Sequence, residues 1–287
     1  MPKDIQSTIN FIPANLEVKS MTGTADFYTH ANDRREVTIH DIRGREKEFT
    51  LSINGFIYIT HDSQHIPITE PTTIKRDLYE ETADLLRNSL QPSPTRVRIA
   101  SHTIRSSFTD LDSEYTGTLG PACAAHLDHT PTGAKKYLYE KFPCEEASQL
   151  SKTRWAIINV WRPLKAIKRD PLAVCDGHTL QKGDLLPIRM DYSANTRAKD
   201  GDSNLRTTVE WEIAMCKYGE QQKWYYLSEM GVNDVLLMKI YDSSHGDAPG
   251  VAVHSSFEDP NQDETVEPRE SIELRCLVFW EDMPLNI

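Results

Sequence analysis

Residues 155–161 read Trp155-Ala156-Ile157-Ile158-Asn159-Val160-Trp161. This run is as long as a β-strand and apolar except at Asn159, so it predicts a strand that crosses a core. The downstream chain repeats the pattern in short segments separated by polar or glycine-rich turns, at 172–175, 185–192, 207–216, 223–227, 235–241, 251–254 and 272–280. Many short strands at regular spacing indicate a sandwich or barrel. We therefore expect a mainly β protein, a double-stranded β-helix or jelly roll.

The chain before this region predicts fewer strands. Residues 1–34 are mixed and polar, and we expect an irregular N-terminal segment there. Asn54-Gly55 between 49–53 and 56–59 favours a hairpin. Residues 75–90 have apolar positions at roughly helical spacing, and 133–142 also favour a helix, so a few helices should flank the sheets. No Pro/Gly/Ser-rich linker interrupts the sequence, which predicts one domain over 1–287 with a jelly-roll core at 96–280.

Composition limits the function classes. The 287 residues are 38% hydrophobic and carry a net charge of -11, which suits a globular protein and opposes a nucleic-acid binder. The five cysteines include no C-x-x-C pair, so neither a structural zinc site nor a disulfide framework is expected, and the cytoplasm is the expected location. We find no signal peptide and no apolar run long enough to span a membrane. The oligomeric state is left open.

Candidate metal ligands stand in His126-Leu127-Asp128. Side chains two residues apart in an extended segment point the same way, so His126 and Asp128 share a face. His254, at the end of a predicted strand far downstream, supplies a second imidazole. Two histidines and one carboxylate form the facial site of non-heme Fe(II) oxygenases. The structural alternative is a loop histidine, an Asx turn and a strand-end histidine, because H-x-D alone is weak; His245-Gly246-Asp247 is a second match in a turn-rich segment.

Arg269 and Ser271 add a second function beside this metal face. They are two residues apart at the start of the apolar run 272–280 and should point the same way. A guanidinium holds a carboxylate through two parallel hydrogen bonds, and a hydroxyl donates a third. A metal site beside residues that bind a carboxylate suits 2-oxoglutarate. The alternative for Arg269 is a surface charge. Trp161 and Arg162 end a predicted core strand and are both candidates for substrate binding; Arg162 either holds a substrate carboxylate or forms a rim salt bridge.

Several motifs, taken in order, resemble one family of fungal and bacterial oxygenases. The motifs are the stretches 41–49, 54–56, 102–105, 126–128, 159–164, 241–243 and 268–273. The family contains fungal gibberellin desaturase, aspergillic-acid hydroxylase and the cephamycin 7α-hydroxylase component, and the resemblance runs from about residue 36 to 280. It implies a jelly roll, Fe(II) and 2-oxoglutarate, with His126, Asp128 and His254 as ligands and Arg269 as the grip. His129 departs from the glutamine or similar residue expected after H-x-D.

The sequence thus predicts an Fe(II)/2-oxoglutarate-dependent dioxygenase that uses O2 on a small natural-product or amino-acid substrate. Hydroxylation, desaturation and oxidative cyclisation remain open, because a fold does not fix a substrate. No catalytic acid or base beyond the metal ligands is expected. Two alternatives remain: an iron oxidase of the same fold that does not use 2-oxoglutarate, and a non-catalytic jelly-roll binding protein.

Overall fold

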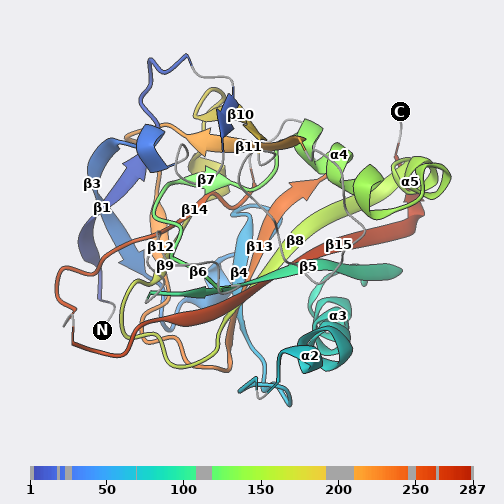
Figure 1. Cartoon of the computed structure of the whole chain (residues 1–287), viewed down its shortest axis with the longest axis horizontal. Coiled ribbons are helices and arrows are strands. Elements are labelled where there is room, and N and C mark those ends of the chain that lie inside the picture. Colours follow the sequence, from blue (N-terminus) through green and yellow to red (C-terminus); the bar gives the residue numbers. More distant parts are fainter. Residues whose placement is uncertain are drawn as a thin grey trace.

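The computed structural model describes residues 3–17, 20–22, 28–68, 70–107, 118–191, 210–244, 250–262 and 265–285. Within these residues two sheets face each other (Figure 1). The larger has nine strands in the order β1-β3-β12-β9-β14-β7-β11-β10-β2, and the smaller has six in the order β4-β13-β8-β15-β5-β6. This arrangement confirms the predicted mainly β jelly roll.

From residue 155 onward the strands lie at the predicted segments, except that the one expected at 251–254 begins only at His254. The larger sheet contains β1 Ile5–Phe11, β2 Ser20–Thr22, β3 Asp33–Asp41, β7 His126–Leu127, β9 Leu172–Cys175, β10 Leu185–Asp191, β11 Glu210–Cys216, β12 Trp224–Tyr226 and β14 His254–Ser256. The smaller sheet contains β4 Phe56–Thr60, β5 Arg96–Ser106, β6 Thr118–Leu119, β8 Thr153–Pro163, β13 Asp234–Asp242 and β15 Glu270–Pro284.

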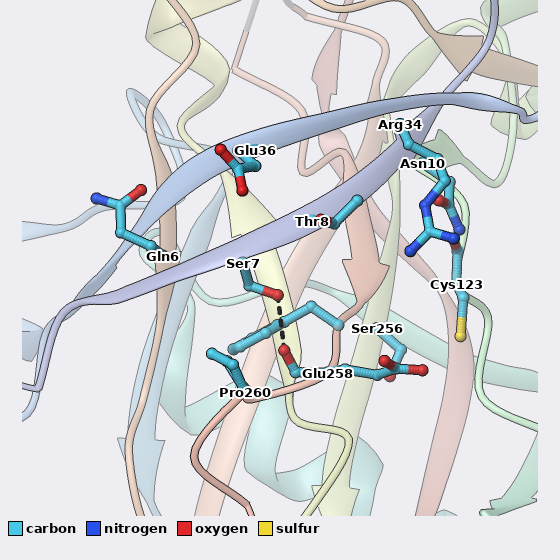
Figure 2. Close-up of a pocket in the computed structure, with 11 residues that line it drawn as sticks. Gln6, Ser7, Thr8, Asn10, Arg34, Glu36, Cys123, Ser256, Glu258 and Pro260 are labelled. Atoms are coloured by element: carbon cyan, nitrogen blue, oxygen red, sulfur yellow. Dashed lines mark hydrogen bonds between the residues drawn. The ribbon is translucent and has the colours of Figure 1, made fainter.

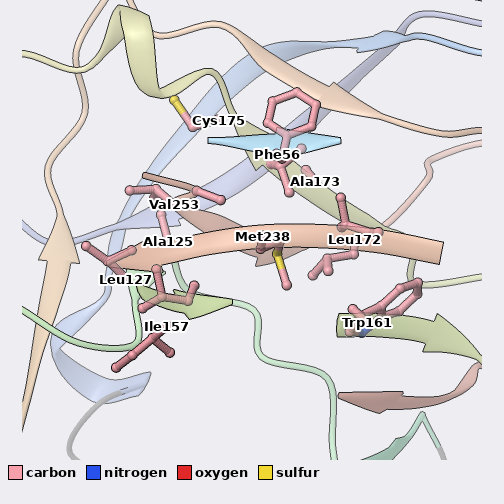
Figure 3. Packing of buried hydrophobic residues seen from close by; sticks show 14 of the residues in the cluster. Phe56, Ala125, Leu127, Ile157, Trp161, Leu172, Ala173, Cys175, Met238 and Val253 are labelled. Carbon is pink, nitrogen blue, oxygen red and sulfur yellow. The ribbon is translucent and has the colours of Figure 1, made fainter. Parts of the chain in front are cut away.

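Strand β8 shows why the apolar run at 155–161 has to be apolar on both faces. Its odd-numbered residues Trp155, Ile157 and Trp161 enter the core between the two sheets. Figure 3 shows Ile157 and Trp161 among the other core side chains. Its even-numbered residues pack into a second apolar cluster that includes residues of α3. Because β8 lies between β13 and β15, neither edge nor face of the strand is left to water.

The helices lie outside the sheets, as Figure 1 shows. Helix α2 Pro71–Thr73, a π-helical turn at Ile74–Leu78 and α3 Tyr79–Ser89 form one continuous segment, which confirms the helix expected at 75–90. Helix α4 Pro131–Lys141 confirms the one expected at 133–142, whereas α5 Cys144–Leu150 was not predicted. No helix in the described part of the chain has the length and apolar character needed to cross a membrane.

The N-terminal segment differs from the expectation of irregular structure over 1–34. Strand β1 pairs antiparallel with β3 along its whole length, and Ile5, Ile9 and Phe11 are buried. The apolar alternation is broken by Ser7, which is also buried and donates a hydrogen bond to the carbonyl of Glu258. Because a polar residue stands on the inward face, the alternation of apolar and polar residues is not visible in the sequence. The sheets begin with β1, well before residue 96.

The expected hairpin at Asn54-Gly55 is also absent. Residues 49–50 are irregular and 51–53 belong to a turn, and β4 pairs with β13 instead. Asn54 Oδ1 accepts a hydrogen bond from the amide of Thr50, which closes a local turn without a strand on that side. Gly55 has φ +82°, so the glycine serves the turn as predicted while the pairing does not form.

Candidate metal centre and carboxylate grip

The proposed ligands meet where two short strands pair. In the larger sheet β7 and β14 are antiparallel neighbours, and His126 lies directly opposite His254. Asp128 follows β7 by one residue. The potential ligand atoms of the three side chains all lie within 4.8 Å of one another, and each residue is at most 9% exposed. Strand pairing therefore brings together residues far apart in the chain.

Each histidine has its tautomer set by the backbone. His126 Nδ1 lies 2.7 Å from the carbonyl oxygen of Ala124, and His254 Nδ1 lies 3.0 Å from that of Ala252. A carbonyl only accepts, so Nδ1 carries the proton and Nε2 carries the lone pair in both rings. Burial, then the nearby His126, lowers the pKa of His254 to about 4. Both conditions suit a neutral imidazole that binds a cation through Nε2.

Asp128 is an ionised carboxylate. Its Oδ2 accepts a hydrogen bond of 2.5 Å from Asn159 Nδ2 and lies 3.0 Å from Arg275 Nη2, while Oδ1 lies 3.6 Å from His126 Nε2. Burial alone raises the pKa of this carboxyl, but the nearby charge of Arg275 outweighs burial and brings the pKa well below its ordinary value. The negative charge is thus present at neutral pH, as a ligand for Fe(II) requires.

Arg269 and Ser271 have buried polar atoms without partners. Arg269 is 1% exposed; its Nη1 donates to the carbonyl of Asp170 and to Ser256 Oγ. Among the described residues no partner is found for Arg269 Nε or for Ser271 Oγ, which is also buried. Burial, and next Arg105, lowers the pKa of Arg269 to about 10, so it remains a cation. A buried cation beside an unpaired hydroxyl suits an anionic carboxylate.

The two substrate candidates separate in the structure. Trp161 faces the core, and its ring lies 5.8 Å from the guanidinium carbon of Arg269. Arg162 is the next residue of β8 and points to the opposite face, where it lies 3.5 Å from Glu81 Oε1 and donates to the carbonyls of His61 and Val232. Of the two alternatives for Arg162, these contacts favour the salt bridge over a substrate carboxylate, because successive strand residues alternate between faces.

Two residues that contact Asp128 were not predicted, although both are polar residues in apolar runs. Asn159 is the single polar residue of 155–161, and Arg275 is one of the two charged residues of 272–280. The other, Glu273, lies 3.6 Å from Arg275, and its pKa is raised by burial and by Asp128. A buried polar residue inside an apolar run is a usable sequence signal for a site. The second H-x-D match, at 245–247, lies outside the described residues.

His129 and its neighbours form an aromatic group beside the ligands. The ring of His129 stacks on Trp211 at 4.9 Å between centroids and lies 4.8 Å from that of Tyr137. Burial, and then Arg275, lowers the pKa of His129 to about 3, so it is neutral. Trp211 Nε1 also donates to the carbonyl of Asp128. These rings fix the backbone at the H-x-D segment rather than offering a further charge.

A pocket of about 260 Å³ opens next to β1 (Figure 2). Ser256 lines it and also accepts a hydrogen bond from Arg269, so the pocket lies near the guanidinium. Its remaining lining is mostly polar and comes from β1, β3 and the segment after β14.

Comparison with known proteins points to one group. A family model described as "Oxidoreductase/YMDC permease-like domain" matches residues 6–279. Hydroxylase/desaturase CTB9 of Cercospora beticola is 34% identical, over 91% of this chain and 81% of its own. The Fe(II)/2-oxoglutarate-dependent dioxygenase nvfI of Aspergillus novofumigatus is 32% identical, over 85% of this chain and 83% of its own.

A solved structure of a related enzyme has the same fold over nearly the whole chain. The iron and alpha-ketoglutarate-dependent endoperoxidase NvfI superimposes with a TM-score of 0.78 and 26% identity, covering 96% of this chain and 98% of that one. The agreement extends over nearly the full length of both chains and therefore includes both sheets.

Proposed function

Because the chain belongs to the family of fungal hydroxylase/desaturases and Fe(II)/2-oxoglutarate-dependent dioxygenases, we propose that His126, Asp128 and His254 hold its ferrous ion. Arg269 and Ser271 bind the far carboxylate of 2-oxoglutarate. The observation that carries the proposal is the donor set: two histidines whose Nδ1 atoms face backbone carbonyls, so that Nε2 carries the lone pair, and one ionised carboxylate, all within 4.8 Å. This is the set that non-heme Fe(II) oxygenases use.

The chain's own residues bind and orient the co-substrate, and they exclude water from the site. The unpartnered Nε of Arg269 and Oγ of Ser271 offer donors to a carboxylate, and the ring of Trp161 covers the guanidinium. When bound, iron with 2-oxoglutarate supplies the O2 activation that removes hydrogen from an unactivated C–H bond. No side chain has to act as a separate acid or base.

The enzyme acts on a small molecule. Its relatives are named as hydroxylase/desaturases, dioxygenases and an endoperoxidase. We place the substrate of this chain in the same broad class of small natural products or amino acids. Arg162 takes no part, since its charge is paired with Glu81 behind the sheet.

The test requires no substrate. The protein is loaded with Fe(II) without oxygen, 2-oxoglutarate is added, and the visible charge-transfer band of the chelate is recorded. The expected result is a band that His254→Ala abolishes. Iron binding without a band would favour an oxidase that does not use 2-oxoglutarate. Failure to bind iron would favour a non-catalytic binding protein.

We also place the enzyme in the cytosol. Its five cysteines, at positions 123, 144, 175, 216 and 276, are free, and three of them are buried. Free thiols suit a reducing compartment. Fractionation of cells that express the tagged full chain should find it with cytosolic markers; recovery in a secreted fraction would refute this.

A further inference from the structure

The two oxygens of Asp128 lie in different surroundings. Oδ2 receives two donors, Asn159 Nδ2 at 2.5 Å and Arg275 Nη2 at 3.0 Å. Oδ1 lies 3.6 Å from His126 Nε2, on the side where the potential ligand atoms converge. One oxygen is therefore held by the protein while the other faces the proposed metal position.

The two donors to Oδ2 are held side by side by strand pairing. Asn159 on β8 and Arg275 on β15 are direct cross-strand partners in the smaller sheet, whereas Asp128 directly follows β7 of the larger sheet. Residues directly opposite on neighbouring strands project side by side from the same face. The register of β8 and β15 thus aims both donors across the interior at a single carboxylate oxygen.

Further contacts hold the donors in place. Asn159 is fully buried, and the Arg275 guanidinium lies 5.1 Å from the ring centre of Trp211 and 3.6 Å from Glu273. Burial by itself lowers the pKa of Arg275, but the carboxylate of Asp128 outweighs it and raises the pKa above its ordinary value. A guanidinium fixed between a ring and two carboxylates has little freedom to release Oδ2.

We propose that Asn159 and Arg275 are positioning residues that restrict Asp128 to binding the metal through one oxygen. The inference rests on the proposed function. Fe(II) offers about six positions, and two histidines with one carboxylate oxygen fill three of them. The remaining three accommodate the two donor atoms of 2-oxoglutarate and O2. A carboxylate that bound through both oxygens would occupy one of these positions.

The experiment counts open positions with Mn(II), a redox-stable probe of water exchange. The protein is loaded with Mn(II), and water-proton relaxivity per bound ion is measured for the wild type, Arg275→Met and Asn159→Leu. Each variant removes one of the two donors to Oδ2 and so weakens the restraint on this oxygen. Relaxivity should fall, by up to about one third where three open positions become two. The affinity of the Mn(II)-loaded protein for 2-oxoglutarate should fall as well.

Arg154→Met is the matched control. Arg154 lies 2.9 Å from a carboxylate oxygen of Asp242 and 4.3 Å from the ring centre of Trp280, so it repeats the surroundings of Arg275 away from the ligands. The control should match the wild type in relaxivity. Wild-type relaxivity in both Arg275→Met and Asn159→Leu would overturn the inference and leave the proposed function intact. Failure of the wild type itself to bind Mn(II) would instead refute the proposed metal site.

Discussion

At the scale of single residues, two backbone carbonyls decide what the histidines can do. Ala124 and Ala252 each lie two residues before a histidine and accept from its Nδ1. The same local geometry on β7 and β14 leaves both Nε2 atoms aimed at one space. Two buried, neutral imidazoles beside an ionised Asp128 are a donor set that a ferrous ion can bind.

Arg269→Ala should weaken 2-oxoglutarate binding strongly. The substitution leaves the co-substrate's carboxylate buried without its cation, at a cost of roughly 2–5 kcal/mol. Titration of the Fe(II)-loaded protein, followed by the charge-transfer band, measures this. Arg162→Met is the control, because it also removes a buried arginine but behind the sheet; it should lower thermal stability and leave 2-oxoglutarate affinity unchanged. Equal 2-oxoglutarate affinities in Arg269→Ala and the wild type would refute the role of Arg269 in binding the co-substrate's carboxylate.

The carboxyl of Asp242 makes the stability of the fold depend on pH. Burial raises the pKa of its carboxyl, but Arg154 and Ser244 outweigh this and bring it below the ordinary 3.8. A folded-state pKa below the unfolded one stabilises the fold above that range, and this contribution is lost as pH falls through the depressed pKa. Asp242→Asn should therefore be less stable at pH 7 by about 1–3 kcal/mol. Urea unfolding should show the gap shrinking below about pH 4; a constant gap down to pH 3 would contradict it.

At the scale of elements, the turn at residues 54–55 supports the segment that leads into β14. The carbonyl of Gly55 accepts from the amide of Lys239, and the Lys239 carbonyl accepts from the amide of Ala252. The turn, β13 and the chain just before His254 are thus joined by backbone hydrogen bonds. The position of one proposed ligand depends on a turn that contributes no side chain to the site.

Gly55→Ala should destabilise the fold more than a comparable glycine change. A Cβ at Gly55, where φ is +82°, would lie 2.6 Å from the backbone carbon of Val251. Gly183 has φ +101° with nothing within 4 Å, so Gly183→Ala costs only the backbone strain, about 1–2 kcal/mol. The Gly55 collision adds about 1–3 kcal/mol. Denaturant unfolding of both variants tests this, and equal losses would show that the contact with Val251 relaxes freely.

At the scale of the whole molecule, the site joins distant parts of the chain. His126 and Asp128 come from around β7, His254 from β14, and the donors to Asp128 from the opposite sheet. A metal bound to the three ligands would therefore tie strands of the larger sheet together and oppose unfolding of the entire fold.

Metal binding should raise the melting temperature of the protein. A ligand that binds only the folded state at 100 times its Kd stabilises it by about 2.7 kcal/mol. Calorimetry with and without Mn(II), and after chelator treatment, measures the shift. His254→Ala should lose the shift, whereas His178→Ala, which changes a histidine of the 3₁₀ turn Gly177–Thr179 outside the ligand group, should keep it. An equal shift in His254→Ala would place the metal elsewhere.

The elements that sequence predicted well are those with an unbroken local period. The run at 172–175 coincides with β9, and the run at 155–161 lies within β8, because apolar residues fill each position that the core surrounds. Strand β1 was missed because a buried serine interrupts its alternation. The hairpin at Asn54-Gly55 was wrong because the turn signal is local, whereas the partner of β4 is chosen by packing against β13.

The sequence by itself determined the mainly β class, and it singled out His126, Asp128, His254, Arg269 and Ser271, because side-chain chemistry and a period of two are local properties. Only the tertiary structure decided that Arg162 turns away from the site and that Asn159 and Arg275 meet at Asp128. Those outcomes depend on the register of β8 against β15 and on the distance between two sheets. Such relations are set by the packing of the whole core, and no short stretch of sequence contains them.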